Sequence, residues 1–282
     1  MELLTIDPDK CNRDGICVAE CPARIIRQTR KDAVPAVIEG GEESCIACGH
    51  CVAVCPEGAI SHRAVPLSAC PPLDGTENIP HTQARRFLRA RRSVRVFKNK
   101  PVARADIARL IDVARYAPTA SNAQLLEWTV IAGAGKIREL AEMAVAWMRQ
   151  AVGTAPDHPR MIYLSRFVAA WDAGTDSILR GAPVLVTASA PKEDLNGMVD
   201  LTLALSYLEL AAPTLGLGTC WAGLLQGAML GSPALKAAVG IPEDHPHHYP
   251  MMLGYPAFRY YRLPERKAAK VRFVDCGLRY TV

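Results

Sequence analysis

The sequence lacks the segments that place a chain in or across a membrane. It contains no run of roughly 18 or more uncharged apolar residues, the length that a helix needs to span a bilayer. Its first residues, MELLTIDPDK, have neither the basic start nor the apolar stretch of a signal peptide. We therefore expect a cytoplasmic protein that does not interact with membranes.

Two catalytic signatures are also missing. No GxGxxG fingerprint of a dinucleotide site is present, so NAD(P)H, if it is used, must bind transiently. No Ser-His-Asp or Cys-His arrangement stands out by motif. The sequence therefore leaves the catalytic residues unknown.

Charge is distributed unevenly along the 282 residues, whose net charge is +5. Residues 1–65 carry 7 Lys and Arg against 10 Asp and Glu, whereas residues 66–282 carry 26 against 18. The basic residues of the second part are scattered through helical patterns, which disfavours nucleic acid as a partner. A bound phosphate group explains a few clustered arginines better.

Cysteine is abundant, and seven of the ten cysteines lie between positions 11 and 55. Such a concentration in a chain expected in the cytoplasm favours metal ligands over disulfides. The other three are Cys70, Cys220 and Cys276. We expect Cys220 to be a packed side chain rather than a nucleophile, and the roles of all three stay open.

The seven clustered cysteines belong to two copies of one motif. The stretch 45-CIACGHCVAVCP-56 is a complete C-x₂-C-x₂-C-x₃-C-P run, which is typical of iron–sulfur ligation. The stretch 11-CNRDGICVAECP-22 matches it position by position, except that Asp14 replaces the second cysteine. This internal repeat puts Asp14 at a true ligand position.

The spacing predicts two sets of ligands. Three ligands spaced three residues apart can wrap one cubane, and the fourth cysteine reaches the other cluster in two-cluster proteins. One set then consists of Cys45, Cys48, Cys51 and Cys21. The other consists of Cys11, Cys17, Cys55 and Asp14. Zinc is the alternative metal, but two copies of a run that ends in proline disfavour it.

Residues 1–62 resemble the bacterial two-cluster ferredoxins. The resemblance implies two short β-hairpins and two short helices around two [4Fe-4S] clusters. Three alternatives are open at Asp14. The carboxylate ligates an intact four-iron cluster, or the cluster lacks that corner and is [3Fe-4S], or Asp14 turns outward and water fills the position. We favour the first.

A proline-rich stretch divides the chain. Residues 65–82, VPLSACPPLDGTENIPHT, contain four prolines and no sustained periodicity, which predicts a semi-rigid, extended linker. We thus expect a two-cluster iron–sulfur domain over residues 1–64, a linker over 65–82 and a second domain over 83–282.

Four motifs follow in the second domain. It opens with 91-RRSVR-95, whose guanidinium and hydroxyl groups suit an anion. A helical pattern over residues 105–117 ends in 117-APTASNAQ-124. A strand pattern over 183–189 and a helical stretch over 197–216 lead to 216-GLGTCWAG-223. The last motif runs from 254-GYP-256 to the basic pair at 266–267.

In this order the motifs resemble the nitroreductase superfamily of FMN proteins, over residues 84–282. The resemblance implies an α+β fold with a central mixed sheet flanked by helices, and a domain-swapped homodimer with FMN at the subunit interface. It places the cofactor against Arg91, Arg92, Ser93, Arg95, Trp221, Ala222, Gly223, Arg266 and Lys267. The loop that covers the partner's flavin then holds Pro118, Thr119, Ala120, Asn122 and Gln124.

Together the two resemblances indicate an FMN-dependent oxidoreductase that receives or passes electrons through two iron–sulfur clusters. Its substrate would be a small organic molecule, nitroaromatic-like or quinone-like, and its electron donor a reduced ferredoxin or NAD(P)H. Two alternatives stay open. The chain is an electron carrier or redox sensor without an organic substrate, or a reductase whose ferredoxin module is only a docking element.

Overall fold

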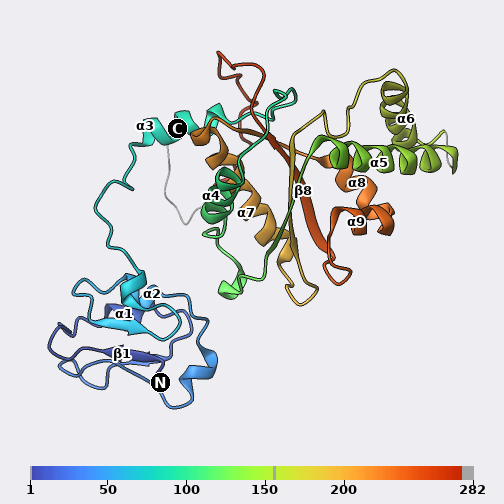
Figure 1. The fold of residues 1–282 in the computed structure, drawn as a ribbon. Coiled ribbons are helices and arrows are strands. Elements are labelled where there is room, and N and C mark those ends of the chain that lie inside the picture. The colour runs from blue at the N-terminus through green and yellow to red at the C-terminus, as the bar shows by residue number, and fades with distance from the viewer. Residues whose placement is uncertain (1, 155–156, 275–282) are drawn as a thin grey trace.

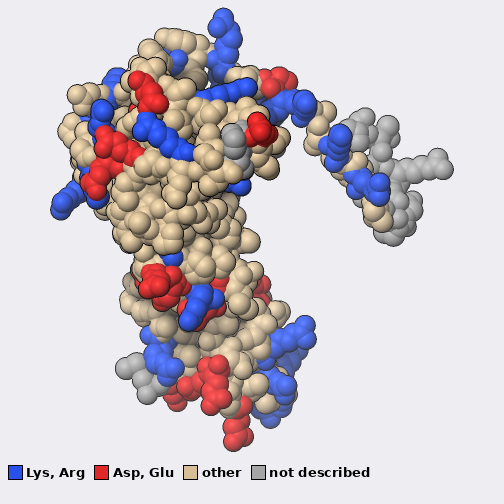
Figure 2. All heavy atoms as spheres, turned by 90° about the vertical axis from the view of Figure 1, so that its right-hand side faces the viewer, with Lys and Arg blue, Asp and Glu red and all other residues tan. Residues whose placement is uncertain are grey.

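The computed structural model describes residues 2–154 and 157–274 of the chain. A small N-terminal lobe (residues 2–64) and a larger C-terminal lobe (residues 83–274) are joined by an extended connection (Figure 1). Cys276 lies outside the described residues. Figure 2 shows acidic and basic side chains interspersed on the visible face of both lobes, apart from the basic segment that leads to the C-terminus.

The N-terminal lobe is built from short elements around its cysteines. Its strands pair as two antiparallel sheets, β1 with β4 and β2 with β3. Only β2 and β3 form a hairpin, because β1 and β4 come from opposite ends of the lobe. The elements are β1 (Leu4–Ile6), α1 (Ile16–Glu20), β2 (Ile26–Arg27), β3 (Ala36–Val37), η1 (Gly41–Ser44), α2 (His50–Ala53) and β4 (Ile60–His62).

The backbone repeats as the sequence does. Gly15 and Gly49 precede α1 and α2 with φ of 72° and 71°, a left-handed conformation that glycine adopts at little cost. Two residues earlier, Arg13 and Ala47 also have positive φ, 61° and 49°. Because non-glycine residues rarely adopt such values, their recurrence shows that both cysteine loops follow the same path.

The connection between the lobes is exposed and carries one short turn, η2 (Leu67–Ala69), before α3 (His81–Ala90) begins. Cys70 lies partly buried, and its Sγ lies 3.5 Å from the carbonyl oxygen of Pro66. Helix α3 begins at His81, two residues before the expected start of the second domain.

A four-stranded sheet forms the centre of the C-terminal lobe, in the order β5-β6-β8-β7. The strands are β5 (Glu127–Ala132), β6 (Val184–Ala190), β7 (Gly218–Trp221) and β8 (His247–Gly254). All three pairings between these described strands are antiparallel. A mixed sheet was expected, and its parallel pairing is an isolated bridge between Ser93 and Thr219.

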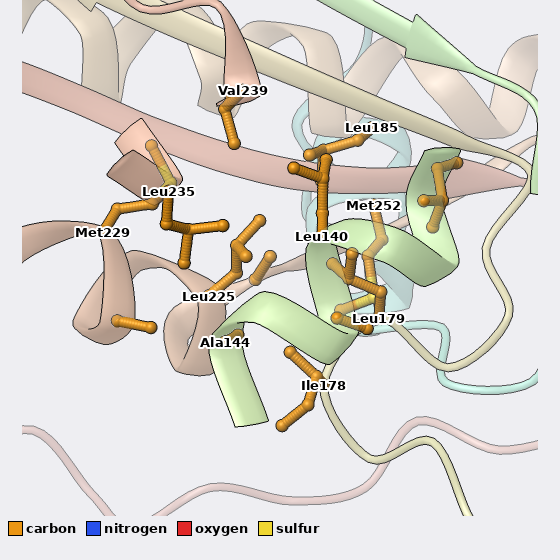
Figure 3. Close-up of a cluster of buried hydrophobic side chains, with 14 of the residues drawn as sticks. Leu140, Ala144, Ile178, Leu179, Leu185, Leu225, Met229, Leu235, Val239 and Met252 are labelled. Carbon is orange, nitrogen blue, oxygen red and sulfur yellow. The ribbon is translucent and has the colours of Figure 1, made fainter. Parts of the chain in front are cut away.

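Helices cover both faces of this sheet, and β6 is buried on both sides. Its side chains alternate, as strand geometry requires. Val184 and Val186 pack toward α4 and α7. Leu185 faces α5, α8 and α9 and belongs to one buried cluster with Leu140, Leu225 and Leu235 (Figure 3). The helices and turns are α4 (Arg104–Ala114), η3 (Ala120–Asn122), α5 (Ala134–Thr154), α6 (Pro159–Asp172), α7 (Gly197–Ala211), η4 (Ala212–Leu215), α8 (Gly223–Gly231) and α9 (Pro233–Val239).

One described helical segment, α7 with η4 (Gly197–Leu215), is long and apolar enough to cross a membrane by length and composition, with a mean hydropathy of 1.2. Its inner face packs on the sheet through Leu201, Leu205 and Leu208, as a core helix does. Only 39% of it is buried within the chain, so its outer face is left without a cover.

Candidate functional site

Three cysteines of the complete motif line one hollow of the N-terminal lobe. Cys45, Cys48 and Cys51 lie there together with Cys21, which comes from the other copy of the repeat. Burial, together with the nearby Cys48 and Cys21, raises the pKa of the Cys51 thiol to about 11. Ionisation of the Cys51 thiol is therefore favoured only when a positively charged group lies beside it.

The second predicted set also comes together. Burial raises the pKa of the Cys17 thiol, and the charges of Asp14, Cys11 and Cys55 raise it further. The Sγ of Cys55 also accepts a hydrogen bond from the backbone N–H of Ala59 at 3.3 Å. Cys55 therefore lies with the first cysteine loop, as the exchange of the fourth ligand requires.

These two sets suit clusters better than single ions. Within residues 2–154 and 157–274, no three His, Cys, Asp or Glu side chains converge closely enough to hold one metal ion. The ligands of a cubane bind separate iron atoms and stand further apart. The donor atoms fit as well, since thiolate is the usual ligand of iron–sulfur clusters.

Asp14 is exposed, and its Oδ1 accepts a hydrogen bond from the backbone N–H of Ile16 at 3.0 Å. The backbone N–H of Asp14 in turn donates to the side-chain oxygen of Asn12 at 3.2 Å. One carboxylate oxygen thus tethers the start of α1, and the other has no hydrogen-bond partner among the described residues.

His62 contacts a predicted ligand, which the sequence analysis missed. Its Nδ1 accepts from the backbone N–H groups of Ala64 and Val65, at 2.9 and 3.3 Å. The ring proton must then be on Nε2, which lies 3.4 Å from the Sγ of Cys45 and donates to it. Burial lowers the pKa of His62, so the neutral ring is favoured.

In the C-terminal lobe, arginines gather around two adjoining cavities of about 280 Å³ each. Arg91 and Arg92 line both, and Arg266 joins them in the first. The buried Nε of Arg92 has no hydrogen-bond partner in the described chain. An unpaired guanidinium nitrogen beside two further arginines suits a phosphate group. Lys267 is exposed on the same segment as Arg266.

A buried carboxylate connects the arginine motif to the glycine-rich turn. Glu209 on α7 is 5% exposed and accepts from Arg91 Nη1 at 2.9 Å and from Trp221 Nε1 at 3.1 Å. Trp221 packs edge-to-face on Tyr249, with ring centroids 5.0 Å apart. The only sequence signal for Glu209 was a charge in a helix that is otherwise uncharged, apart from Asp200.

The start of β7 lies against the arginine motif. The backbone N–H of Val94 donates to the carbonyl of Thr219 at 2.8 Å. A Cβ on Gly218 would stand 2.4 Å from a methyl carbon of Val94, so only glycine permits this approach. The side chain of Arg95 donates weakly to the carbonyl of Ser93 at 3.5 Å. Cys220 is buried in the core as expected, and burial raises its pKa.

The loop over residues 118–124 does not join this group within the chain. It is held at the other end of α7, where the Asp200 carboxylate accepts from the backbone N–H of Ala120 at 3.0 and 3.2 Å. Asp200 and Glu209 lie about 13 Å apart along the helix, at a rise of about 1.5 Å per residue. Pro118, Thr119, Ala120, Asn122 and Gln124 are therefore separated from Arg91, Arg92, Ser93, Arg95 and Trp221.

Two family models match the chain. The model of the nitroreductase family matches residues 88–255, and that of the 4Fe-4S dicluster domain matches residues 3–56. No curated protein matches the chain.

Solved structures share the fold of the C-terminal lobe. A nitroreductase with bound FMN from Bacteroides fragilis NCTC 9343 is 24% identical, with a TM-score of 0.57 over 68% of this chain and 99% of that one. A BluB-like flavoprotein from Clostridium difficile 630 is 23% identical, with a TM-score of 0.52 over 66% and 94%. A nitroreductase with bound FMN from Desulfitobacterium hafniense DCB-2 is 19% identical, with a TM-score of 0.53 over 69% and 100%.

Fold and motifs define an electron-transferring oxidoreductase fused to an iron–sulfur module of the two-cluster type. The chain belongs to the nitroreductase family, with a 4Fe-4S dicluster domain at its N-terminal side.

Proposed function

We propose that the chain is an FMN-dependent oxidoreductase that exchanges electrons through two iron–sulfur clusters and reduces a small nitroaromatic-like or quinone-like molecule. When bound, the clusters would carry single electrons and FMN would take one or two, so that single-electron supply is coupled to two-electron reduction. Two similar solved structures contain FMN, which supports this choice of flavin.

The residues proposed to hold FMN divide by the part that they would contact. The arginine cavities and the unpaired Arg92 Nε support a phosphate site made by Arg91, Arg92 and Arg266. Ser93 and Lys267 line neither cavity and are proposed to join the site because they follow Arg92 and Arg266 in the chain. The flavin ring would lie by Arg95 and the backbone of Trp221, Ala222 and Gly223. A cation at Arg95 would favour the anionic reduced ring.

We further propose that the active form is a cytoplasmic homodimer. The outer face of α7 exposes Val199, Leu203 and Tyr207, at 57%, 36% and 40%. Their spacing of four residues puts them on one side of the helix. A second copy would cover this stripe and bring its 118–124 loop to the cavity that this chain's own loop does not reach. The domain boundaries 1–64, 65–82 and 83–282 belong to the same proposal.

The observation that carries the proposed function is the convergence of Cys21 with Cys45, Cys48 and Cys51 in a chain of the nitroreductase family. Such a set would put an electron relay beside a flavin enzyme. The test is anaerobic stopped-flow mixing of the dithionite-reduced protein with a nitroaromatic compound or a quinone. Cluster and flavin absorption bands are followed separately, and consumption of the compound is measured.

We expect both bands to reoxidise while the compound is consumed. The double variant Cys48→Ala and Cys51→Ala should lose the cluster-dependent part of turnover, whereas Cys70→Ala, which changes a cysteine outside both ligand sets, should keep it. Failure to consume any compound would favour the electron carrier or redox sensor. Full turnover by the double variant would favour a ferredoxin module that only docks.

A further inference from the structure

One side chain of the C-terminal lobe is hydrogen-bonded to the second cysteine loop. The amide Nδ2 of Asn122 donates to the backbone carbonyls of Ile46 and Ala47, at 3.0 and 3.1 Å. Both carbonyls lie between the predicted ligands Cys45 and Cys48. In Figure 1 the loop after α4 extends toward the N-terminal lobe.

The internal repeat shows that this contact is specific to the second loop. Arg13 corresponds to Ala47, and its carbonyl accepts from Gln28 Nε2 at 3.1 Å, within the N-terminal lobe. The same amide also donates to Lys31 and Ala33, at 3.1 and 2.8 Å. The first loop is therefore closed by a residue of its own lobe.

The residue that corresponds to Gln28 in the second copy is His62. Its ring is turned toward Cys45 and bonded to the backbone of the turn that follows β4, so it does not donate to Ala47. The exchange of glutamine for histidine leaves the carbonyls of the second loop open to a donor from outside the lobe. Asn122 supplies that donor.

The loop that carries Asn122 is anchored to helix α7. The carboxylate of Asp200, which is 2% exposed on α7, accepts from the backbone N–H of Ala120. Asn122 itself has a φ of 55°, a left-handed conformation that asparagine tolerates better than most residues. The amide is thus held outward from the C-terminal lobe by a buried anchor.

We propose that Asn122 is a docking residue that seats the iron–sulfur lobe on the flavin lobe by its second cysteine loop, a role that replaces the flavin contact expected of its amide from the sequence. The site formed by Cys21, Cys45, Cys48 and Cys51 then adjoins the C-terminal lobe, and the site that contains Asp14 does not. The inference deepens the proposed function and rests on it for the meaning of the contact, which is to select the cluster site next to the flavin domain.

The repeat supplies a matched pair of variants for the test. Asn122→Ala removes the amide that donates a hydrogen bond to the carbonyl of residue 47. Gln28→Ala removes the amide that donates a hydrogen bond to the carbonyl of residue 13. Docking is measured on the full holoprotein under anaerobic conditions, by small-angle scattering and by amide hydrogen exchange of peptides that span residues 45–50 and 119–126. Iron, sulfide and flavin contents are measured in each variant.

Two hydrogen bonds of ordinary strength are lost in Asn122→Ala, so the ratio of docked to undocked lobes should fall about thirtyfold. Exchange should rise in both peptides and the radius of gyration should increase. Asn122→Asp, which keeps the shape but removes the donor, should behave in the same way. Gln28→Ala should leave docking unchanged while it speeds exchange around residue 13.

Unchanged scattering and exchange in both Asn122 variants would overturn the inference, as would equal undocking in Gln28→Ala. None of these measurements depends on an organic substrate. A protein that docks as described but reduces no compound would therefore contradict the proposed function and leave the docking role of Asn122 intact.

Discussion

The carboxylate of Glu209 accepts a hydrogen bond from the indole N–H of Trp221 at 3.1 Å, while its other oxygen holds Arg91. Glu209 is nearly inaccessible to solvent, so its charge is stabilised chiefly by these two donors. It therefore fixes two side chains from distant parts of the sequence in one arrangement, next to the cavity proposed to hold the cofactor phosphate.

Glu209→Ala should weaken FMN binding about tenfold, because an untethered Arg91 must be ordered when the cofactor binds. The free energy of unfolding of the variant should also fall by about 1–3 kcal/mol, since the buried indole N–H loses its hydrogen-bond partner. Fluorescence titration of the apoprotein with FMN and urea unfolding measure the two effects. Glu142→Ala breaks an exposed ion pair with Arg138 and should change neither. Unaltered FMN affinity in Glu209→Ala would contradict the role of the network.

The anaerobic protein should contain about eight irons per chain. Air should then bring the content to about seven and produce an oxidised three-iron EPR signal, because a carboxylate oxygen is a harder ligand than thiolate. Asp14→Cys should keep its iron under the same exposure. An anaerobic content near four irons would contradict the presence of two clusters, and equal iron loss in both proteins would contradict the weakness of the Asp14 corner.

Leu203→Arg should separate the proposed dimer, since it puts a charge in the middle of the exposed stripe of α7. Light scattering after gel filtration should give the mass of one chain for the variant and of two for the wild type. Leu195→Arg makes the same change at a side chain that is 89% exposed and outside the stripe, and this variant should remain a dimer. A dimeric Leu203→Arg protein would place the interface elsewhere.

Stability should fall in acid through His248. Burial lowers the pKa of this residue to about 4, with a smaller effect of Lys236 and His247, and its Nδ1 is bonded to Gln226 Oε1 at 3.1 Å. The unfolded state therefore binds a proton first, and stability is lost as pH falls from about 6.5 toward 4. Between pH 7.5 and pH 5 this amounts to about 2 kcal/mol.

Urea unfolding at the two pH values measures that loss. His248→Asn should reduce the dependence on pH by about this amount, and the same substitution at the exposed His81 should preserve it. If the free energy of unfolding of His248→Asn depends on pH as strongly as that of the wild type, groups other than His248 cause the loss of stability. The comparison is made under anaerobic conditions so that cluster damage does not contribute.

Local patterns predicted much of the fold. The helical pattern over 105–117 corresponds to α4 at 104–114, and the strand pattern over 183–189 corresponds to β6 at 184–190. The helix expected over 197–216 ends as η4, with Gly216 left-handed at φ 70°. These agreements come from periodicity and from chain-ending residues, which act over a few positions.

Contacts between distant segments could not be read in this way. Glu209 lies on α7 and its partners come from the arginine motif and β7, and no local spacing relates the three segments. The aligned repeat already shows that His62 stands where the first copy has Gln28. The consequence of this difference, however, depends on the position of Asn122 in the fold. Helices α5, α6, α8 and α9 were also not predicted, because their apolar positions serve a core shared with the sheet.

The exposed connection between the lobes has a consequence for how strong their contact must be. Two hydrogen bonds are too few to hold two separate proteins together at cellular concentrations. A tether of this length keeps its ends at an effective concentration in the millimolar range, so a contact that would fail between free molecules can form, break and form again. Fusion thus allows a weak contact to bring the iron–sulfur lobe against the C-terminal lobe repeatedly, without a large permanent interface between them.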